Sequence, residues 1–395
     1  MRKESEIKKV GIVCAYQFPE GMAPTIRILA YSKGLRQNGV DVEIFTFKET
    51  PAGEDIPMEG YVNGILYKRS YIKRRKGLFV GLCDRLNMFR RLYQQIKTSD
   101  KVSPFDYILL SFDSLDKLYT IVPLLKLLNK RLLFIGDEFP EPIRRLKKDI
   151  PWWQKPAYRF IHRFLDGRIL MTRNLQKFYD KRAGEKPTFI LNSIIDEKRF
   201  ESVSRQPVEQ KYICYMGNMQ LAKDNVDNII RAFSIISSSY PDYHLWLFGT
   251  PSEKDRKIIE DVIAETDMQD KVLIKGRIDY DQVPQVLANA SILVTSQPVT
   301  TRAEGGFPTK MAEYMMSGTP MIVTDVGEIC NYVTDGENAF VVEPCNPEAY
   351  ANKIRYIFSS SEIAEKVAQR ANIDAMTNFS SKITLKQLIE FLNCK

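Results

Sequence analysis

The sequence is poor in the residues and segments that mark metal sites, disulfide frameworks and membrane spans. Its 395 residues include only two histidines, His162 and His244, and the six cysteines are scattered without a C-x-x-C pair. These absences argue against a histidine-based zinc site and a disulfide scaffold. Residues 118–129, the best apolar run, contain Pro123 and Lys126 and fall short of the roughly 20 residues that span a bilayer.

Signal-peptide and nucleotide-binding fingerprints are also missing. The N-terminal ten residues run directly into an apolar strand-like segment, without a signal-peptide pattern. No G-x-G-x-x-G follows the first predicted strand, which argues against a nicotinamide-type site, and no G-x-x-x-x-G-K-[ST] phosphate loop occurs. With the unpaired cysteines, this favours a reduced protein of the cytoplasm.

Charge is distributed unevenly along a composition typical of a globular protein, with 44% apolar and 27% charged residues. Residues 1–200 hold 38 Lys and Arg against 23 Asp and Glu, a net charge of +15, whereas residues 201–395 hold 19 against 26, a net charge of −7. We therefore expect the N-terminal half to meet an anionic partner. Because the charge is not joined to a recognised module, nucleic acid is not that partner.

A basic helix in the first half has two interpretations. Apolar residues recur at helical spacing over residues 79–96, beside the basic segments 67–77 and 143–148 and the arginines Arg85, Arg90 and Arg91. The helix either lies on an anionic membrane, at the inner face of which the protein would be peripheral, or packs one face into a core and exposes a solvated basic face.

Short apolar segments alternate with helical patterns through both halves, which predicts two doubly wound α/β domains. Near-continuous Val, Ile, Leu and Phe runs are typical of parallel strands buried on both faces. We predict domains at residues 1–200 and 201–375, a polar linker over 196–211, and a C-terminal helix over 376–395. The predicted strands are residues 9–16, 40–47, 64–71, 107–112, 131–137, 167–173, 188–192, 212–218, 243–249, 271–276, 291–296, 321–325 and 339–344.

Glycines follow several of these strands, at the edge where doubly wound sheets bind ligands. They are Gly21, Gly217, Gly249 and Gly276. Glycine lets a ligand approach the backbone closely, and N–H groups at helix starts attract anions, so these loops suit a phosphate-bearing ligand. The stretch "EGGFPTKMAEYMMSGTP" (304–320) predicts a flexible, carboxylate-bearing loop that runs into a packed helix.

Four segments of the second half carry a family resemblance: "YMGNMQLAKDNVDNIIRAF", "LWLFGTP", "DKVLIKGRIDYDQVPQVLANASILVTS" and the long block from "EGGFPTKMAEYMM" to "NPEAYANKI". They resemble the donor-binding domain of the retaining family-4 glycosyltransferases (group 1) of GT-B fold. The first half is similar more loosely, through "GMAPTIRILAYSKGLRQNGVDVEIFTF" and "LNSIIDEKRF". The resemblance implies two Rossmann-like domains that face each other across a cleft, with the C-terminal helix returning to the first domain.

The resemblance also implies roles for individual residues. Glu313 falls on the glutamate that binds the ribose hydroxyls, and Glu304 is the candidate for the glutamate that contacts the donor sugar. Lys223 falls on the lysine that neutralises the diphosphate, which the Gly21 loop faces. Further implied contacts to the nucleotide sugar come from Gly217, Asn218, Gly249, Arg277, Ile278, Arg302, Gly305, Gly306, Phe307, Pro308 and Thr309. Cations and N–H dipoles aimed at a departing diphosphate stabilise its developing charge, which is the chemistry such a transfer needs.

Two departures from the family pattern concern the donor side. Glu304 and Glu313 are nine positions apart where the family has eight, so Gly305 occupies the slot of the first glutamate. Asn218 stands where an arginine is usual, and Arg302 is a candidate replacement.

A third departure concerns the acceptor side, where Gly136 stands at a position that holds histidine in many members. Asp137 or Glu138 then becomes the candidate acceptor-side base, or else the pair caps and begins a following helix. The "DYD" at 279–281 matches a metal-binding D-x-D of another glycosyltransferase fold, but we interpret Asp281 as a helix N-cap and expect no metal.

We therefore expect a hexosyltransferase-type enzyme that moves a sugar from a UDP- or GDP-linked donor, with retention of configuration and without a cofactor. The expected acceptor is a polyprenyl-diphosphate-linked or polysaccharide intermediate of cell-surface glycan synthesis. Two alternatives stay open: a nucleotide-sugar epimerase or hydrolase on the same fold, and a non-catalytic subunit that binds nucleotide or membrane.

Overall fold

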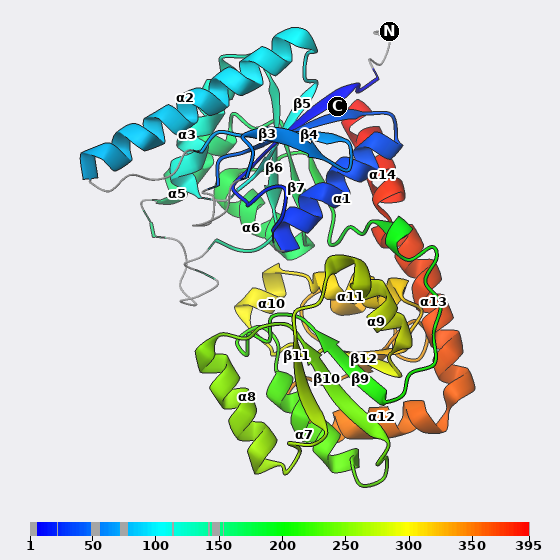
Figure 1. Ribbon diagram of the computed structural model, residues 1–395. Coiled ribbons are helices and arrows are strands. Elements are labelled where there is room, and N and C mark those ends of the chain that lie inside the picture. The colour runs from blue at the N-terminus through cyan, green and yellow to red at the C-terminus, as the bar shows by residue number, and fades with distance from the viewer. Residues whose placement is uncertain are drawn as a thin grey trace. The chain divides into compact units, whose positions relative to one another are not determined.

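The computed structural model describes residues 6–21, 23–48, 56–71, 78–112, 114–140, 143, 151–152 and 154–394, without the side chains of residues 78–82. The chain divides into two compact units (Figure 1). Unit 1 comprises residues 1–196 and 381–395, and unit 2 comprises residues 197–380. The predicted boundaries at residues 200 and 375 lie four and five residues from these.

Unit 1 is built on an eight-stranded sheet in the order β3-β4-β2-β1-β5-β6-β7-β8, in which only β3 runs antiparallel to its neighbour. Each strand predicted in this half is present. The strands are β1 (Lys9–Cys14), β2 (Asp41–Thr46), β3 (Glu59–Val62), β4 (Ile65–Arg69), β5 (Tyr107–Ser111), β6 (Arg131–Gly136), β7 (Gly167–Leu170) and β8 (Thr188–Ile190). The unpredicted β3 pairs with β4 across Asn63 and Gly64, which have positive φ of 51° and 73° as a tight hairpin turn requires.

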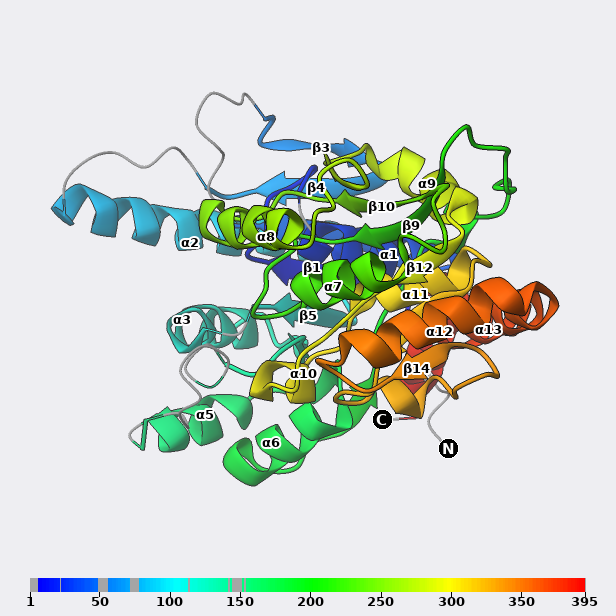
Figure 2. The ribbon, with the colours of Figure 1, turned by 90° about the horizontal axis from the view of Figure 1, so that it is seen from below.

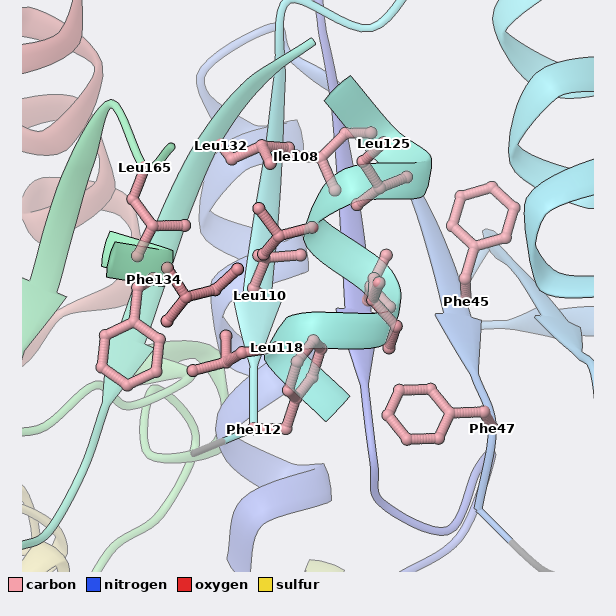
Figure 3. Packing of buried hydrophobic residues seen from close by; sticks show 14 of the residues in the cluster. Phe45, Phe47, Ile108, Leu110, Phe112, Leu118, Leu125, Leu132, Phe134 and Leu165 are labelled. Atoms are coloured by element: carbon pink, nitrogen blue, oxygen red, sulfur yellow. The ribbon is translucent and has the colours of Figure 1, made fainter. Parts of the chain in front are cut away.

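Helices cover both faces of this sheet because β5 turns alternate apolar residues to opposite sides. Ile108 and Leu110 join the core beneath one group of helices, whereas Tyr107 and Leu109 join the core beneath the other. The first group is α2 (Leu78–Val102), α3 (Leu115–Lys126), α5 (Gln154–His162) and α6 (Arg173–Ala183), and the second is α1 (Ala23–Gln37) and α14 (Ser381–Asn393). Figure 3 shows Leu118 and Leu125 of α3 over Ile108 and Leu110 of β5, and Figure 2 shows α5 between α3 and α6.

The C-terminal helix α14 packs against α1 within unit 1 (Figure 1). Asn38 Nδ2 donates to the carbonyl of Lys382 at 2.8 Å, and Ser381 N donates to the carbonyl of Ile195 at 2.8 Å. A Cβ on Gly34 would lie 2.3 Å from the Ser381 carbonyl oxygen, so the two backbones approach each other only because residue 34 is glycine.

Helix α2 confirms the helix predicted over 79–96, and its burial bears on the choice between packing into a core and lying on a membrane. Phe89, Leu92 and Ile96 are buried in the core, so the second half of α2 packs inward, whereas Leu86 in the first half is 62% exposed. Residues 72–77 and 144–148 of the basic segments lie outside the described residues. None of the helices in the described part of the chain combines the length and apolar character needed to cross a bilayer.

Unit 2 has a parallel sheet in the order β11-β10-β9-β12-β13-β14. Its strands are β9 (Lys211–Met216), β10 (Tyr243–Phe248), β11 (Val272–Gly276), β12 (Ile292–Val294), β13 (Met321–Thr324) and β14 (Phe340–Val342), all of them predicted. Figure 1 shows α7 (Val226–Ile236), α8 (Glu253–Glu265) and α12 (Pro347–Ser359) on one face and α9 (Val283–Asn289) and α11 (Thr309–Met316) on the other. Helices α10 (Thr301–Gly305) and α13 (Ser361–Phe379) complete this unit.

One local prediction in unit 2 is wrong and another holds only in part. The predicted linker over 196–211 begins with the 3₁₀ turn η1 (Glu197–Arg199), in which Glu197 is buried, whereas residues 200–210 form neither helix nor strand. Asp281 is not a helix N-cap: it lies within the 3₁₀ turn η2 (Tyr280–Gln282), where Asp279 precedes the turn and Gln282 caps α9. Tertiary contacts of η1 and the extra turn before α9 outweigh the local polar pattern in both places.

Candidate functional site

The loops after β9, β10 and β11 meet through their glycines at the carboxyl edge of the unit 2 sheet. Gly217 N donates to the Phe248 carbonyl at 3.0 Å, and Gly249 N donates to the Gly276 carbonyl at 2.7 Å. Gly249 has a φ of 129°, and a Cβ there would lie 1.7 Å from the Gly217 carbonyl oxygen. Only glycine therefore fits at residue 249, and the edge presents backbone rather than side chains.

Helix α11 meets this edge through a buried ion pair. Lys310 Nζ lies 2.9 Å from Asp224 Oδ1 and donates to the Tyr215 hydroxyl at 3.0 Å, and that hydroxyl donates to Asp224 Oδ2 at 2.9 Å. The Lys310 and Asp224 side chains are 14% and 2% exposed. Burial lowers the pKa of Lys310, which the charge of Asp224 opposes. A Cβ on Gly217 would lie 2.7 Å from Lys310 Nζ, so the ammonium group lies directly against the glycine loop.

Glu313, one turn further along α11, is held by an arginine from η1. Arg199 Nη1 donates to Glu313 Oε1 at 2.8 Å, and Nη2 of the same guanidinium donates to the carbonyl of Tyr280. The guanidinium carbon lies 3.4 Å from the centre of the Tyr280 ring. The Glu313 side chain is 27% exposed, whereas that of Arg199 is 8% exposed. The carboxylate is therefore held by a buried guanidinium and is still accessible.

Lys223 and Asn218 lie in the loop between β9 and α7. Lys223 is half-buried, and its charge contributes to the lowered pKa of Lys310, which places the two cations near each other. Asn218 is exposed, and its Oδ1 accepts a hydrogen bond from Gln220 N at 3.3 Å. Arg302 of α10 donates from Nη1 to Gln220 Oε1 at 3.2 Å. Arg302 thus reaches the loop that contains Asn218.

Residues 304 and 305 end helix α10, so the predicted loop is shorter than expected: residues 306–308 connect α10 to the packed helix α11. Helix α10 begins at the N-cap Thr300, whose side chain accepts a hydrogen bond from Ala303 N at 3.2 Å. Glu304 is exposed in its last turn, Gly305 is buried, and Gly306 and Pro308 are the caps that end α10 and precede α11. Phe307 turns its ring into a core with Tyr332 and Phe379, at 5.3 and 5.9 Å between ring centres, while Thr309 is exposed.

Arg277 and Ile278 follow the end of β11, with Arg277 exposed and Ile278 half-buried. Arg277 lies three residues and Ile278 two residues before Tyr280, which contacts Arg199. The D-x-D aspartates Asp279 and Asp281 are exposed in this segment. Within the described ranges, no three His, Cys, Asp or Glu side chains gather into a group that could hold a metal ion.

In unit 1, the candidates Gly21, Asp137 and Glu138 lie at the carboxyl ends of β1 and β6. Thr25 Oγ1 donates to the Gln17 carbonyl at 2.7 Å and would lie 2.2 Å from a Cβ on Gly21, so the loop folds tightly over the start of α1. Asp137 Oδ1 lies 3.2 Å from Nε of the buried Arg27. Glu138, beside it, is half-buried.

Lys310 and Arg199 were not among the site residues predicted from the sequence. Lys310 has a local signal, since positions 310 and 313 are three apart and share one face of α11. Arg199 has no local signal. It lies in the segment predicted as a linker, and its partner Glu313 is 114 positions away in the sequence.

Comparison with known proteins gives a family match over most of unit 2. Residues 196–374 match the family model of glycosyl transferases group 1. Poly(glycerol-phosphate) alpha-glucosyltransferase of Bacillus subtilis (strain 168) is 24% identical over 208 residues, which are 52% of this chain and 30% of that protein. The chain spans less than half the length of the curated relatives it matches.

Solved structures are similar over nearly the whole chain. Sucrose-phosphate synthase from Thermosynechococcus elongatus has a TM-score of 0.73 at 17% identity, covering 98% of this chain and 99% of that one. Anabaena Alr3699/HepE, in complex with UDP and glucose, also has a TM-score of 0.73, at 14% identity, covering 98% of this chain and 100% of that one. Residues 196–374 are therefore similar to the group 1 glycosyl transferases, and the fold of the chain is that of the GT-B glycosyltransferase structures.

Proposed function

We propose that the protein is a glycosyltransferase that moves a sugar from a nucleotide-sugar donor to an acceptor, without a metal ion and with retention of configuration. The observation that carries the proposal is the carboxyl edge of unit 2. There, neighbouring glycine loops lie beside α11, which carries a buried ammonium group and an oriented carboxylate. The family match of residues 196–374 supports the same reaction class.

The residues of this edge would bind different parts of the nucleotide sugar. Breaking the bond between sugar and diphosphate leaves negative charge on the nucleoside diphosphate, which Lys223 and Lys310 would stabilise from fixed positions. A preorganised donor group of this kind contributes roughly 3–4 kcal/mol in comparable oxyanion sites. Glu313 would accept hydrogen bonds from the ribose hydroxyls, in a charge-assisted geometry that Arg199 fixes. Glu304 and the backbone of Gly305, Gly306 and Thr309 would contact the donor sugar.

The sugar donor is either UDP-linked or GDP-linked, and UDP is the better supported nucleotide. The fold neighbour Alr3699/HepE is described in complex with UDP and glucose. In our proposal, Arg277 and Ile278 read the base, while Gly217, Gly249 and the loop of Asn218 and Arg302 approach the diphosphate.

The acceptor is proposed to be an anionic glycan or a lipid-diphosphate-linked intermediate. Unit 1 carries 39 Lys and Arg against 23 Asp and Glu, a net charge of +16, which attracts such a molecule. A relative named as a poly(glycerol-phosphate) alpha-glucosyltransferase supports an acceptor rich in phosphate. Asp137 or Glu138 is the proposed base for the acceptor hydroxyl, and Arg27 holds Asp137 in place.

We also propose that unit 1 binds an anionic membrane surface peripherally, at the inner face of the membrane. The first half of α2 supports this, because Leu86 is 62% exposed on a helix that also carries Arg85, Arg90 and Arg91. A basic helix with an exposed apolar residue is suited to the interface of an anionic bilayer.

Sugar transfer itself tests the proposal. UDP-glucose and GDP-mannose would be supplied in excess chelator, with poly(glycerol phosphate) or a bacterial lipid extract as the acceptor. We expect transfer from one donor, with the anomeric configuration of the donor kept in the product. Release of free sugar or an epimer without acceptor would replace the proposal by a hydrolase or epimerase. Nucleotide binding without any turnover would favour a non-catalytic subunit.

A further inference from the structure

Arg199 contacts two separate segments of the candidate site, although it lies in a three-residue turn at the start of unit 2. Its guanidinium uses three different surfaces. One nitrogen donates to the Glu313 carboxylate, another donates to the Tyr280 carbonyl, and the flat face lies on the Tyr280 ring. One planar cation therefore joins helix α11 to the segment that follows β11.

Arginine suits this position better than lysine would. The guanidinium is planar, always charged and carries its N–H groups in a fixed fork, so it can bond two acceptors and stack on an aromatic ring at once. At 8% exposure the Arg199 side chain is shielded from water, which strengthens its bond to Glu313. Its Nε is buried and has no hydrogen-bond partner among the described residues.

The two segments that Arg199 joins have different tasks in the proposed donor site. Glu313 on α11 would bind the ribose hydroxyls, whereas the segment Arg277–Tyr280 after β11 would read the base. Arg199 already donates to Oε1 of Glu313, so the ribose hydroxyls would bind mainly to the other carboxylate oxygen. Displacing the guanidinium would release the carboxylate and the base-reading segment together.

We propose that Arg199 is a positioning residue that couples ribose recognition to base recognition in the nucleotide site. The inference rests on the proposed function, because it assumes that this edge of unit 2 binds a nucleoside diphosphate. It predicts that two kinds of selectivity, for the 2′-hydroxyl and for the base, depend on one side chain that touches neither.

Calorimetric titration separates the two kinds of selectivity. UDP, GDP, dUDP and dGDP would be titrated into the full chain and into the variants Glu313→Gln, Arg199→Gln and Arg199→Lys. Ribose selectivity is the affinity ratio of each nucleotide to its 2′-deoxy form, and base selectivity is the ratio of UDP to GDP. Glu313→Gln should lower ribose selectivity by about tenfold and leave base selectivity unchanged, since one charge-assisted hydrogen bond is lost.

Arg199→Gln should lower both ratios, each by about tenfold, and the double variant with Glu313→Gln should lose no further ribose selectivity. Arg199→Lys keeps the charge but removes the fork, so it should lose base selectivity while it keeps part of the ribose selectivity. This variant also covers the case in which Arg199→Gln fails to fold. Arg231→Gln on α7, which removes an exposed partner of Glu265 on α8, is the matched control and should change neither ratio.

The outcomes distinguish two failures. If Glu313→Gln changes nothing, the nucleotide site is not where we place it, and the proposed function falls with the inference. If Glu313→Gln abolishes ribose selectivity while both Arg199 variants keep base selectivity, the site stands and the coupling role of Arg199 is wrong.

Discussion

The two units share one architecture but carry opposite net charge. Unit 1 has a net charge of +16, whereas unit 2, with 18 Lys and Arg against 26 Asp and Glu, has a net charge of −8. Yet it is the acidic unit 2 whose sheet edge gathers Lys223, Lys310 and Arg199 around the proposed site of an anionic ligand. The net charge of a unit therefore governs which molecules its whole surface attracts over distance, whereas a binding site depends on a few cations that their neighbours hold in place.

The largest predicted loss of stability concerns the buried ion pairs, because Glu43 in unit 1 has two lysines near it whereas Asp224 in unit 2 is paired with Lys310. Lys310→Met leaves Asp224 buried without its cation, which should cost about 3–5 kcal/mol of unfolding free energy. Lys9→Met in unit 1 should cost clearly less, because Glu43 keeps Lys68 at 3.5 Å. Urea denaturation of both variants measures the difference, and equal losses would contradict the redundancy argument. The double variant Lys310→Met with Asp224→Asn should recover part of the loss.

Glycine loops at the edge of unit 2 give the next effect. Gly249→Ala forces a Cβ to within 1.7 Å of the Gly217 carbonyl oxygen at a φ of 129° and should cost about 3 kcal/mol while abolishing nucleotide binding. Gly276→Ala is the matched control, since a Cβ there would meet no atom within 4 Å. At its φ of 72° the control should cost only about 1 kcal/mol. Thermal unfolding of the two variants tests this, and similar melting temperatures would argue against the close approach of the loops.

Acid should weaken unit 1 through His162, which is buried among Phe134, Tyr158 and Tyr179. Burial, with smaller contributions from Arg168 and Lys186, lowers the pKa of His162 from 6.5 to about 3. Between these values the unfolded chain binds a proton that the folded chain does not. Stability is therefore lost as the pH falls below about 6.5, by about 1.4 kcal/mol per unit and about 2 kcal/mol at pH 5.

The variant His162→Phe should remove this part of the pH dependence while keeping the aromatic packing. Urea unfolding at pH 7 and pH 5 provides the measurement, with His244→Gln in unit 2 as the control. A wild-type slope that survives in His162→Phe would show that other groups govern the acid response.

The smallest predicted effect concerns the basic surface of unit 1. Replacing Arg90 and Arg91 by glutamine should weaken binding to vesicles that contain phosphatidylserine by about 1 kcal/mol for each charge removed. Arg231 and Arg256 of unit 2, replaced in the same way, should have no effect. Vesicle sedimentation at low and high salt tests the proposal, and equal binding by both double variants would contradict a membrane role for α2.

The sequence predicted what depends on local pattern and missed what depends on distant contacts. The apolar runs of both sheets and the glycines at their carboxyl ends are local signals, and the structure has a strand in each predicted segment. Strand β3 was missed although Asn63 and Gly64 mark its hairpin turn. The partnership of Arg199 with Glu313 could not be predicted, because nothing near residue 199 indicates an acceptor 114 positions away. Whether Glu304 contacts a sugar stays a prediction.

Calorimetric titration of UDP and GDP in excess chelator, into the wild-type protein and the variants Lys223→Ala and Glu313→Ala, tests the central claim most directly. We predict that one nucleotide binds without metal and that each variant weakens it at least about tenfold, the equivalent of one charge-assisted contact. Binding that requires a divalent cation, or that both variants leave unchanged, would contradict a nucleotide site at the carboxyl edge of unit 2.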